Sequence, residues 1–104
     1  MPLYAYLLQP TGGTSKCPDV GQAEADILAA HFRHLQDLRV AKSLQFAGVG
    51  GQAHFGLVLF EAENSLVAEA TMSADPLVSS GCMTGQCVPF QVVLQAGAPY
   101  LHVA

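Results

Sequence analysis

His31 is the residue of this sequence with the clearest capacity for chemistry. It falls within residues 20–43, a segment with no proline and, apart from Gly21, no glycine, which predicts one long helix. At 100° per residue, His31 points between the directions of Ile27 and Leu28, on the apolar face of that helix. An inward imidazole can exchange protons near neutral pH and so serve as a general acid or base. The structural alternative is a core histidine that bonds a backbone carbonyl group.

Asp75 directly precedes Pro76 and suits two roles at once. Aspartate is a preferred N-cap residue and proline is favoured at the first helical position, so the pair predicts that Asp75 caps a short helix over residues 76–80. The second carboxylate oxygen remains for an imidazole, and such a bond would fix the ring tautomer and raise its basicity. Asp75 is therefore a candidate both for structure and for chemistry.

A metal site is the other arrangement that these residue types suggest. His34 lies three residues beyond His31 and is its neighbour on the helix, so the two imidazoles and Asp75 could supply the ligand set of a non-haem iron site. However, His34 falls at the edge of the inward face, and Arg33 separates the two histidines in sequence. We therefore expect no metal ion.

Two glycine-containing segments invite comparison with nucleotide-binding loops. Residues 48–51 (GVGG) join two expected strands and open no helix, and residues 11–16 (TGGTSK) lack the spacing of a phosphate-binding loop. Both are interpreted as turns. The Gly-x-Ser-x-Gly motif of serine hydrolases does not occur in the sequence. We expect the protein to use no cofactor.

The three cysteines, Cys17, Cys82 and Cys87, are odd in number and form no CxxC pair. This usage is typical of free thiols in a reducing compartment, and it favours a cytoplasmic protein. Small buried or half-buried thiols are the favoured interpretation, and a reactive thiol at Cys82 or Cys87 is the alternative.

The composition narrows the classes of partner. Of 104 residues, 51% are hydrophobic and 12% are charged, against ~25% charged in typical domains, which excludes a disordered chain. The net charge of −4 would repel a phosphate backbone, so no nucleic acid partner is expected. No run approaches the roughly 18 apolar residues of a membrane-spanning helix, and no basic region leads into a long apolar stretch at the N-terminus. We expect one soluble, unexported domain with no membrane partner.

The order of the expected elements defines a fold class. Strand-forming stretches cover residues 3–8, 44–47, 54–61 and 88–94, and helices cover residues 20–43 and 63–74. Asn64 or Ser65 caps the second helix, Pro76 ends it, and residues 77–86 are irregular or a short helical turn. This β-α-β-β-α-β order is that of the α+β ferredoxin-like fold, a four-stranded antiparallel sheet with both helices on one face. We expect one domain over residues 1–94 and a C-terminal tail, 95–104, that adds an edge strand or a dimer arm.

Both faces of that sheet are expected to be apolar. In the expected strands over residues 3–8 and 54–61, the two alternating sets of side chains are both mostly hydrophobic. An apolar second face needs a cover, and no expected segment is left to supply one. The economical solution is a second copy packed sheet to sheet, giving a homodimer or a higher oligomer. The alternative is a monomer whose tail folds across the open face.

Several stretches of the chain resemble the YCII-related domains of the dimeric α/β-barrel superfamily. The matching pieces are residues 30–35 (AHFRHL), 46–48 (FAG), 55–61 (FGLVLFE), 74–81 (ADPLVSSG) and 88–90 (VPF). The resemblance extends over residues 3–94. It implies a ferredoxin-like subunit that dimerises sheet to sheet as an α/β barrel, with a paired histidine and aspartate proposed as its active site. On this chain, those two residues are His31 and Asp75.

The resemblance also carries an expectation about chemistry. A few relatives remove HCl from chlorinated hydroxyquinones, and most have no assigned reaction. This sequence departs from the pattern in its short hairpin at residues 51–54 and in its linker at residues 10–21, which contains Pro, Gly and Cys. These departures leave the substrate open.

The expected function is that of a small-molecule enzyme. His31 would act as general acid or base and Asp75 would orient it, in an elimination, isomerisation or hydrolysis of a small aromatic or lactone-like metabolite. The alternative is a non-catalytic dimer that binds a metabolite or serves only a structural role. The expected partners are a second copy of the chain and a small-molecule ligand. The residues expected around that ligand are Tyr4, Tyr6, His34, Phe46 and Phe60.

Overall fold

The strands and helices follow one another along the chain in the expected order. The computed structural model describes residues 1–10, 21–51, 55–94 and 96, and the side chains of residues 21–24 are outside this description. The elements are β1 (Leu3–Pro10), α1 (Gly21–Val40), β2 (Leu44–Gly50), β3 (Phe55–Glu61), α2 (Ser65–Ser73), α3 (Pro76–Ser79) and β4 (Met83–Phe90). Residues 11–20 of the expected linker over 10–21, residues 52–54 of the expected hairpin over 51–54, and nearly all of the expected tail over 95–104 lie outside the described residues.

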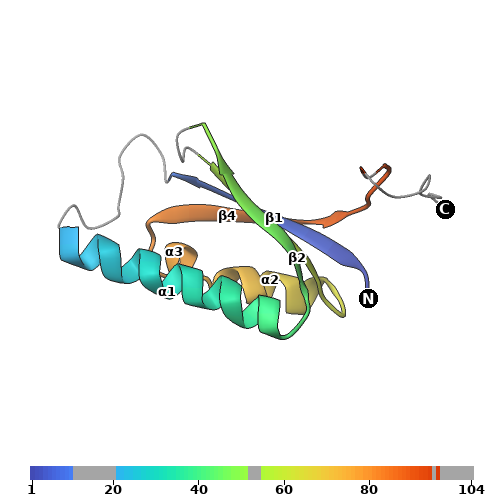
Figure 1. Ribbon diagram of the computed structural model, residues 1–104, viewed down its shortest axis with the longest axis horizontal. Helices are drawn as coiled ribbons and strands as arrows, with labels where there is room; N and C mark the ends of the chain where they lie inside the picture. The colour runs from blue at the N-terminus through green and yellow to red at the C-terminus, as the bar shows by residue number, and fades with distance from the viewer. Residues whose placement is uncertain (11–20, 52–54, 95, 97–104) are drawn as a thin grey trace.

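The strands form one four-stranded antiparallel sheet. Their order across the sheet is β2-β3-β1-β4, so β1 and β3 are the inner strands. The three helices lie together on one side of this sheet (Figure 1). The α+β ferredoxin-like fold expected from the sequence is therefore confirmed. No helix in the described part of the chain is long and apolar enough to cross a membrane.

The core lies between the sheet and the helices. Tyr4, Tyr6 and Leu8 of β1 face it, and they meet Val58 and Phe60 of β3, their partners or near neighbours in the register. The rings of Tyr6 and Phe60 meet edge to face with their centroids 5.6 Å apart, a favoured aromatic geometry. This row of large side chains fixes the position of β1 against the helices.

The opposite face of the sheet is also apolar, as expected. Because side chains alternate along a strand, Leu3, Ala5 and Leu7 of β1 point away from the helices. Exposed aromatic rings gather on the same face: Phe46 is 51% exposed, Phe55 42% and Phe90 43%. Large apolar side chains in contact with water on one face are typical of a surface that another molecule covers.

Two glycine-containing segments were expected to break strands and instead belong to them. β4 begins at Met83 and ends at Phe90, so the expected strand over 88–94 is displaced toward the N-terminus. Its first residues pair with the end of β1, and Gly85 allows this because an added Cβ atom would lie 2.7 Å from the sulfur of Met72. β2 likewise continues through Gly48 to Gly50 instead of ending at Ala47. Close packing of another side chain favours glycine at Gly85 and also at Gly50, where an added Cβ atom would meet the Phe55 ring, whereas the space around Gly48 is open.

Two helices begin with side-chain caps. The Asn64 side chain accepts the Val67 N–H at 2.9 Å at the start of α2, which decides between the two expected caps. Asp75 caps α3 as expected, and Pro76 occupies its first turn. The α3 helix thereby holds the backbone of Asp75 in an extended conformation directly beneath the sheet.

Candidate active site

His31 and Asp75 meet in the core, between α1 and α3. The His31 Nδ1 atom lies 2.8 Å from Oδ1 and 2.8 Å from Oδ2 of Asp75. Both residues are buried: Asp75 is 0% exposed and His31 7%. The contact joins residues 44 positions apart in sequence, so it depends on the packing of α1 against α3 and not on local structure.

Three donors surround the Asp75 carboxylate. Besides the contact with His31, the Tyr6 hydroxyl donates to Oδ2 at 2.8 Å and the Leu77 N–H donates to Oδ1 at 2.9 Å. Burial by itself raises the pKa of Asp75, but the hydrogen bonds from His31, Leu77 and Tyr6 outweigh it and hold that pKa below its usual value. Asp75 is therefore a carboxylate anion at neutral pH, and it accepts all three bonds.

The charge on Asp75 decides the tautomer of His31. A carboxylate anion only accepts hydrogen bonds, so Nδ1 of His31 must carry the proton and donate it. In neutral imidazole the other nitrogen, Nε2, then holds a free lone pair. No hydrogen bond to Nε2 occurs within the described part of the chain. The site thus contains one basic nitrogen, Nε2 of His31, on a ring whose Nδ1–H donates to the buried Asp75 carboxylate.

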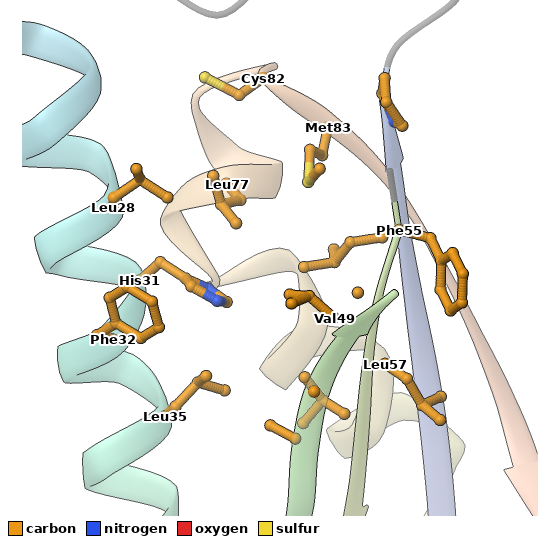
Figure 2. Close-up of a pocket in the computed structure, with 16 residues that line it drawn as sticks. Leu28, His31, Phe32, Leu35, Val49, Phe55, Leu57, Leu77, Cys82 and Met83 are labelled. Atoms are coloured by element: carbon orange, nitrogen blue, oxygen red, sulfur yellow. The ribbon is translucent and has the colours of Figure 1, made fainter. Parts of the chain in front are cut away.

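A cavity of about 570 Å³ opens beside His31, a volume typical of small-molecule sites. Figure 2 shows the ring of His31 reaching into this space, with Leu28, Phe32 and Leu35 of α1 beside it and Val49 opposite. Among the described lining residues, His31 alone has a free side chain that titrates. The described residues that line the cavity are Leu8, Pro10, Leu28, His31, Phe32, Leu35, Ala47, Gly48, Val49, Phe55, Gly56, Leu57, Val58, Leu77, Cys82 and Met83.

Phe32 and Val49 are the most exposed large hydrophobic side chains among the described residues of the lining. Phe32 is 60% exposed and Val49 75%, and the Phe32 ring lies 5.3 Å from the His31 ring between centroids. The side chains of Phe55 and Leu57, by contrast, point to the far side of the sheet (Figure 2). The cavity is therefore bounded by α1 on one side and by the backbone of β3 on the other.

The structure brings only one of the expected ligand-binding residues to the His31–Asp75 pair. Tyr6 donates to Asp75, whereas Tyr4 and Phe60 are buried in the core. Phe46 lies on the opposite face of the sheet, and the Nε2 atom of His34 is buried without a partner among the described residues. None of these five residues lines the cavity.

The lining residues that sequence reasoning missed come from two sources. Helical spacing could have identified Leu28 and Leu35, which lie three residues before and four residues after His31. It does not identify Phe32, the residue directly after His31. Val49 and Met83 line the cavity because β2 and β4 extend beyond their expected ends. Their positions could not be inferred while those strand boundaries were misplaced.

One cysteine contradicts the sequence-based expectation. Cys82 is disulfide-bonded, so the chain does not contain three free thiols, and the cysteine argument for a reducing compartment no longer holds. Cys87 is a free, half-buried thiol in β4, and its burial, followed by the charge of Glu69, raises its pKa. A nucleophilic role at Cys87 is not favoured, because a raised pKa leaves little thiolate at neutral pH.

The described residues form no cluster of three metal ligands at the His31–Asp75 pair. Within the described ranges, no three His, Cys, Asp or Glu side chains gather closely enough to hold a metal ion. His34 in particular does not join His31 on the Asp75 carboxylate, which already accepts three hydrogen bonds.

Fold and site together define an α+β protein of the ferredoxin-like type with a buried His–Asp pair beside an apolar cavity. Among solved structures, the chain is similar to 5-chloro-2-hydroxyhydroquinone dehydrochlorinase (TftG) from Burkholderia phenoliruptrix AC1100, in complex with 2,5-dihydroxybenzoquinone. The TM-score is 0.61 at 18% identity, over 86% of this chain and 93% of that chain. No protein-family model and no curated protein matches the sequence. The likeness shows the shared fold.

Proposed function

We propose that this protein is a small-molecule enzyme in which His31 is the general acid and base and Asp75 orients it. One observation carries the proposal: Nδ1 of His31 lies 2.8 Å from both oxygens of a buried carboxylate, while the ring faces a cavity of about 570 Å³. A base held in one tautomer beside a cavity with mainly apolar lining suits proton transfer to or from a small molecule. We also propose that the chain belongs among the YCII-related domains that it resembles.

Elimination or isomerisation is the reaction class that fits a single base, the one such group among the described lining residues. Nε2 of His31 takes a proton from the ligand, the electron pair of that bond forms a new double bond, and a leaving group departs with its own electron pair. In an isomerisation, the imidazolium returns the proton to another atom of the same ligand. Asp75 stabilises the imidazolium in either case. Hydrolysis of a lactone-like ring, with His31 activating water, uses the same two residues.

The structural neighbour supplies a starting point for the choice of substrate. Its name describes removal of HCl, and its structure holds a dihydroxybenzoquinone. We propose a small, mainly apolar ring compound as the ligand of this chain, because nearly all described side chains around the cavity are apolar. Chlorinated hydroxyaromatics come first among candidates, followed by unchlorinated hydroxyaromatics and lactones.

The first prediction is that a panel of these compounds contains a substrate. Wild-type protein should convert at least one of them, as followed by ultraviolet absorbance and, for the chlorinated compounds, by release of chloride. A metabolite-binding protein is the second candidate, because a single polar group in an apolar cavity also suits a ligand clamp. It predicts a ligand-induced rise in Tm with no turnover. If the protein shows no turnover and no ligand-induced rise in Tm with any compound of the panel, both functions are contradicted.

We further propose that the protein forms a homodimer through the apolar face of the sheet opposite the helices. That face carries Phe46, Phe55 and Phe90, each more than a third exposed in a single chain. Two sheets packed face to face would remove these rings from water, and burial of apolar surface is the main favourable contribution to association. The expected particle has twice the chain mass of 10.9 kDa.

The second prediction tests this interface with one charge. Leu7→Glu places a carboxylate in the middle of β1 on the opposite face, where the side chain is half-buried, and should reduce the light-scattering mass to that of one chain. Leu66→Glu is the matched control, since Leu66 is 80% exposed on α2. A wild-type particle with the mass of one chain would contradict the dimer. If Leu7→Glu and Leu66→Glu both keep the wild-type mass of two chains, the dimer does not form through this face.

A further inference from the structure

Tyr6 is the one ionisable group at the His31–Asp75 pair that the proposed reaction leaves without a part. Its side chain is 0% exposed and comes from the inner strand β1, opposite the helices that carry the other two residues. Its hydroxyl donates to Oδ2 of Asp75 at 2.8 Å. Burial, followed by the charge of Asp75, raises the pKa of this phenol far above its usual value. The hydroxyl therefore keeps its proton and acts only as a donor to Asp75.

The geometry around Asp75 is symmetric. Nδ1 of His31 is 2.8 Å from each oxygen, so the imidazole donor lies midway between the two oxygens. The Leu77 N–H holds Oδ1 from one side, and the Tyr6 hydroxyl holds Oδ2 from the other. With both of these donors in place, the buried carboxylate cannot rotate about its Cβ–Cγ bond without breaking a hydrogen bond.

We propose that Tyr6 is a positioning residue that locks the Asp75 carboxylate in the orientation that keeps the proton of His31 on Nδ1 and leaves Nε2 free toward the cavity. This inference rests on the proposed function for its catalytic meaning, because a free Nε2 is what makes His31 a base. The effect itself exists without any substrate. Without the Tyr6 hydroxyl, the carboxylate keeps one fixed oxygen only, and the contact with Nδ1 weakens as the group rotates.

The experiment measures the tautomer of His31 by ¹⁵N NMR of labelled imidazole, at an alkaline pH where histidines are neutral. Wild-type protein should show His31 almost wholly as the Nδ1–H form. Tyr6→Phe should lower the ratio of the Nδ1–H to the Nε2–H form roughly tenfold, in keeping with the loss of a hydrogen bond to a charged group. Tyr4→Phe is the matched control, because Tyr4 is a buried tyrosine of the same strand and the same face.

A second variant separates the hydrogen bond from packing. The replacement of Tyr6 by 4-fluorophenylalanine fills the space of the hydroxyl with an atom that cannot donate, and it should lower the tautomer ratio as Tyr6→Phe does. An unchanged ratio in either folded Tyr6 variant overturns the proposal, as does an equal fall in Tyr4→Phe. A protein that converts no compound of the panel would contradict the proposed enzyme while leaving this measurement valid, because the tautomer is read without substrate.

Discussion

Replacing His31 with glutamine is expected to lower kcat/KM by at least ~10²-fold on any substrate that the panel identifies, which is the usual contribution of a general acid or base. Glutamine can still donate an amide N–H to Asp75, so the buried carboxylate keeps a partner. It cannot accept and return a proton as an imidazole does. The loss should therefore appear mainly in kcat, measured from initial rates with wild-type and variant protein side by side.

The matched control for this result is Arg33→Gln. Arg33 lies on the exposed side of α1, two residues from His31, and it does not line the cavity. Its replacement should leave kcat/KM within about twofold of wild type, as is usual for surface positions away from a site. Wild-type activity in a folded His31→Gln protein would remove His31 from the mechanism.

Asp75→Asn is expected to reduce both activity and stability. The asparagine Oδ1 can still accept the Leu77 N–H and cap α3, but the Nδ2–H₂ group that replaces Oδ2 cannot accept from the Tyr6 hydroxyl. Buried donors left without an acceptor cost ~1–3 kcal/mol each, so the free energy of unfolding should fall measurably. The Nδ2–H₂ group of the asparagine can also donate to Nδ1 of His31, which favours the opposite tautomer, so kcat/KM should fall by about 10²-fold or more.

Asn64→Asp is the control for the capping part of this effect. Asn64 caps α2 with an exposed side chain. Asn64→Asp exchanges the same two residue types at this cap, far from a buried hydrogen-bond network, so it tests the capping contribution alone. It should leave activity unchanged and alter stability only slightly. A folded Asp75→Asn protein with wild-type activity and stability would show that the charge of Asp75 is unimportant.

The stability difference between wild type and Asp75→Asn should depend on pH. The pKa of Asp75 is lower in the folded protein than in the unfolded chain, so its stabilising contribution is complete above the ordinary carboxyl pKa. The contribution is lost as the pH falls from that ordinary value through the lowered pKa of the folded state. Thermal unfolding across this acid range should show the two Tm values converging. A difference in Tm that does not shrink as the pH falls would contradict the lowered pKa.

The order of elements was predictable because short-range signals mark it. Proline and glycine separate the apolar runs, and the long segment after Gly21 has the periodicity of a helix. The strand boundaries could not be predicted correctly, because Gly48 and Gly85 were interpreted as residues that end a strand. Glycine is needed at position 85 because Met72 packs closely against β4 there. The local sequence around Gly85 does not indicate this contact, because Met72 belongs to another element.

The chemistry of the site was more predictable than its walls. His31 stands out as a polar residue on an apolar helix face, and Asp75 as a cap before Pro76, so both could be singled out from local patterns. Phe46 could not be placed, because a register shift between Leu44 and Phe46 breaks the alternation of β2 and turns the ring to the opposite face. The role of Tyr6 depends on a contact across 69 positions of sequence, which no pattern within β1 reveals.

The most direct test of the central claim is ¹⁵N NMR of the histidine side chains during titration with a compound that the panel shows to be a substrate or ligand. The chain has four histidines, so the other three serve as internal controls. If His31 is the base that faces the cavity, the Nε2 signal of His31 should shift with saturation while its Nδ1–H signal stays bonded to Asp75. A ligand that saturates the protein and leaves the Nε2 signal of His31 unmoved would contradict the account.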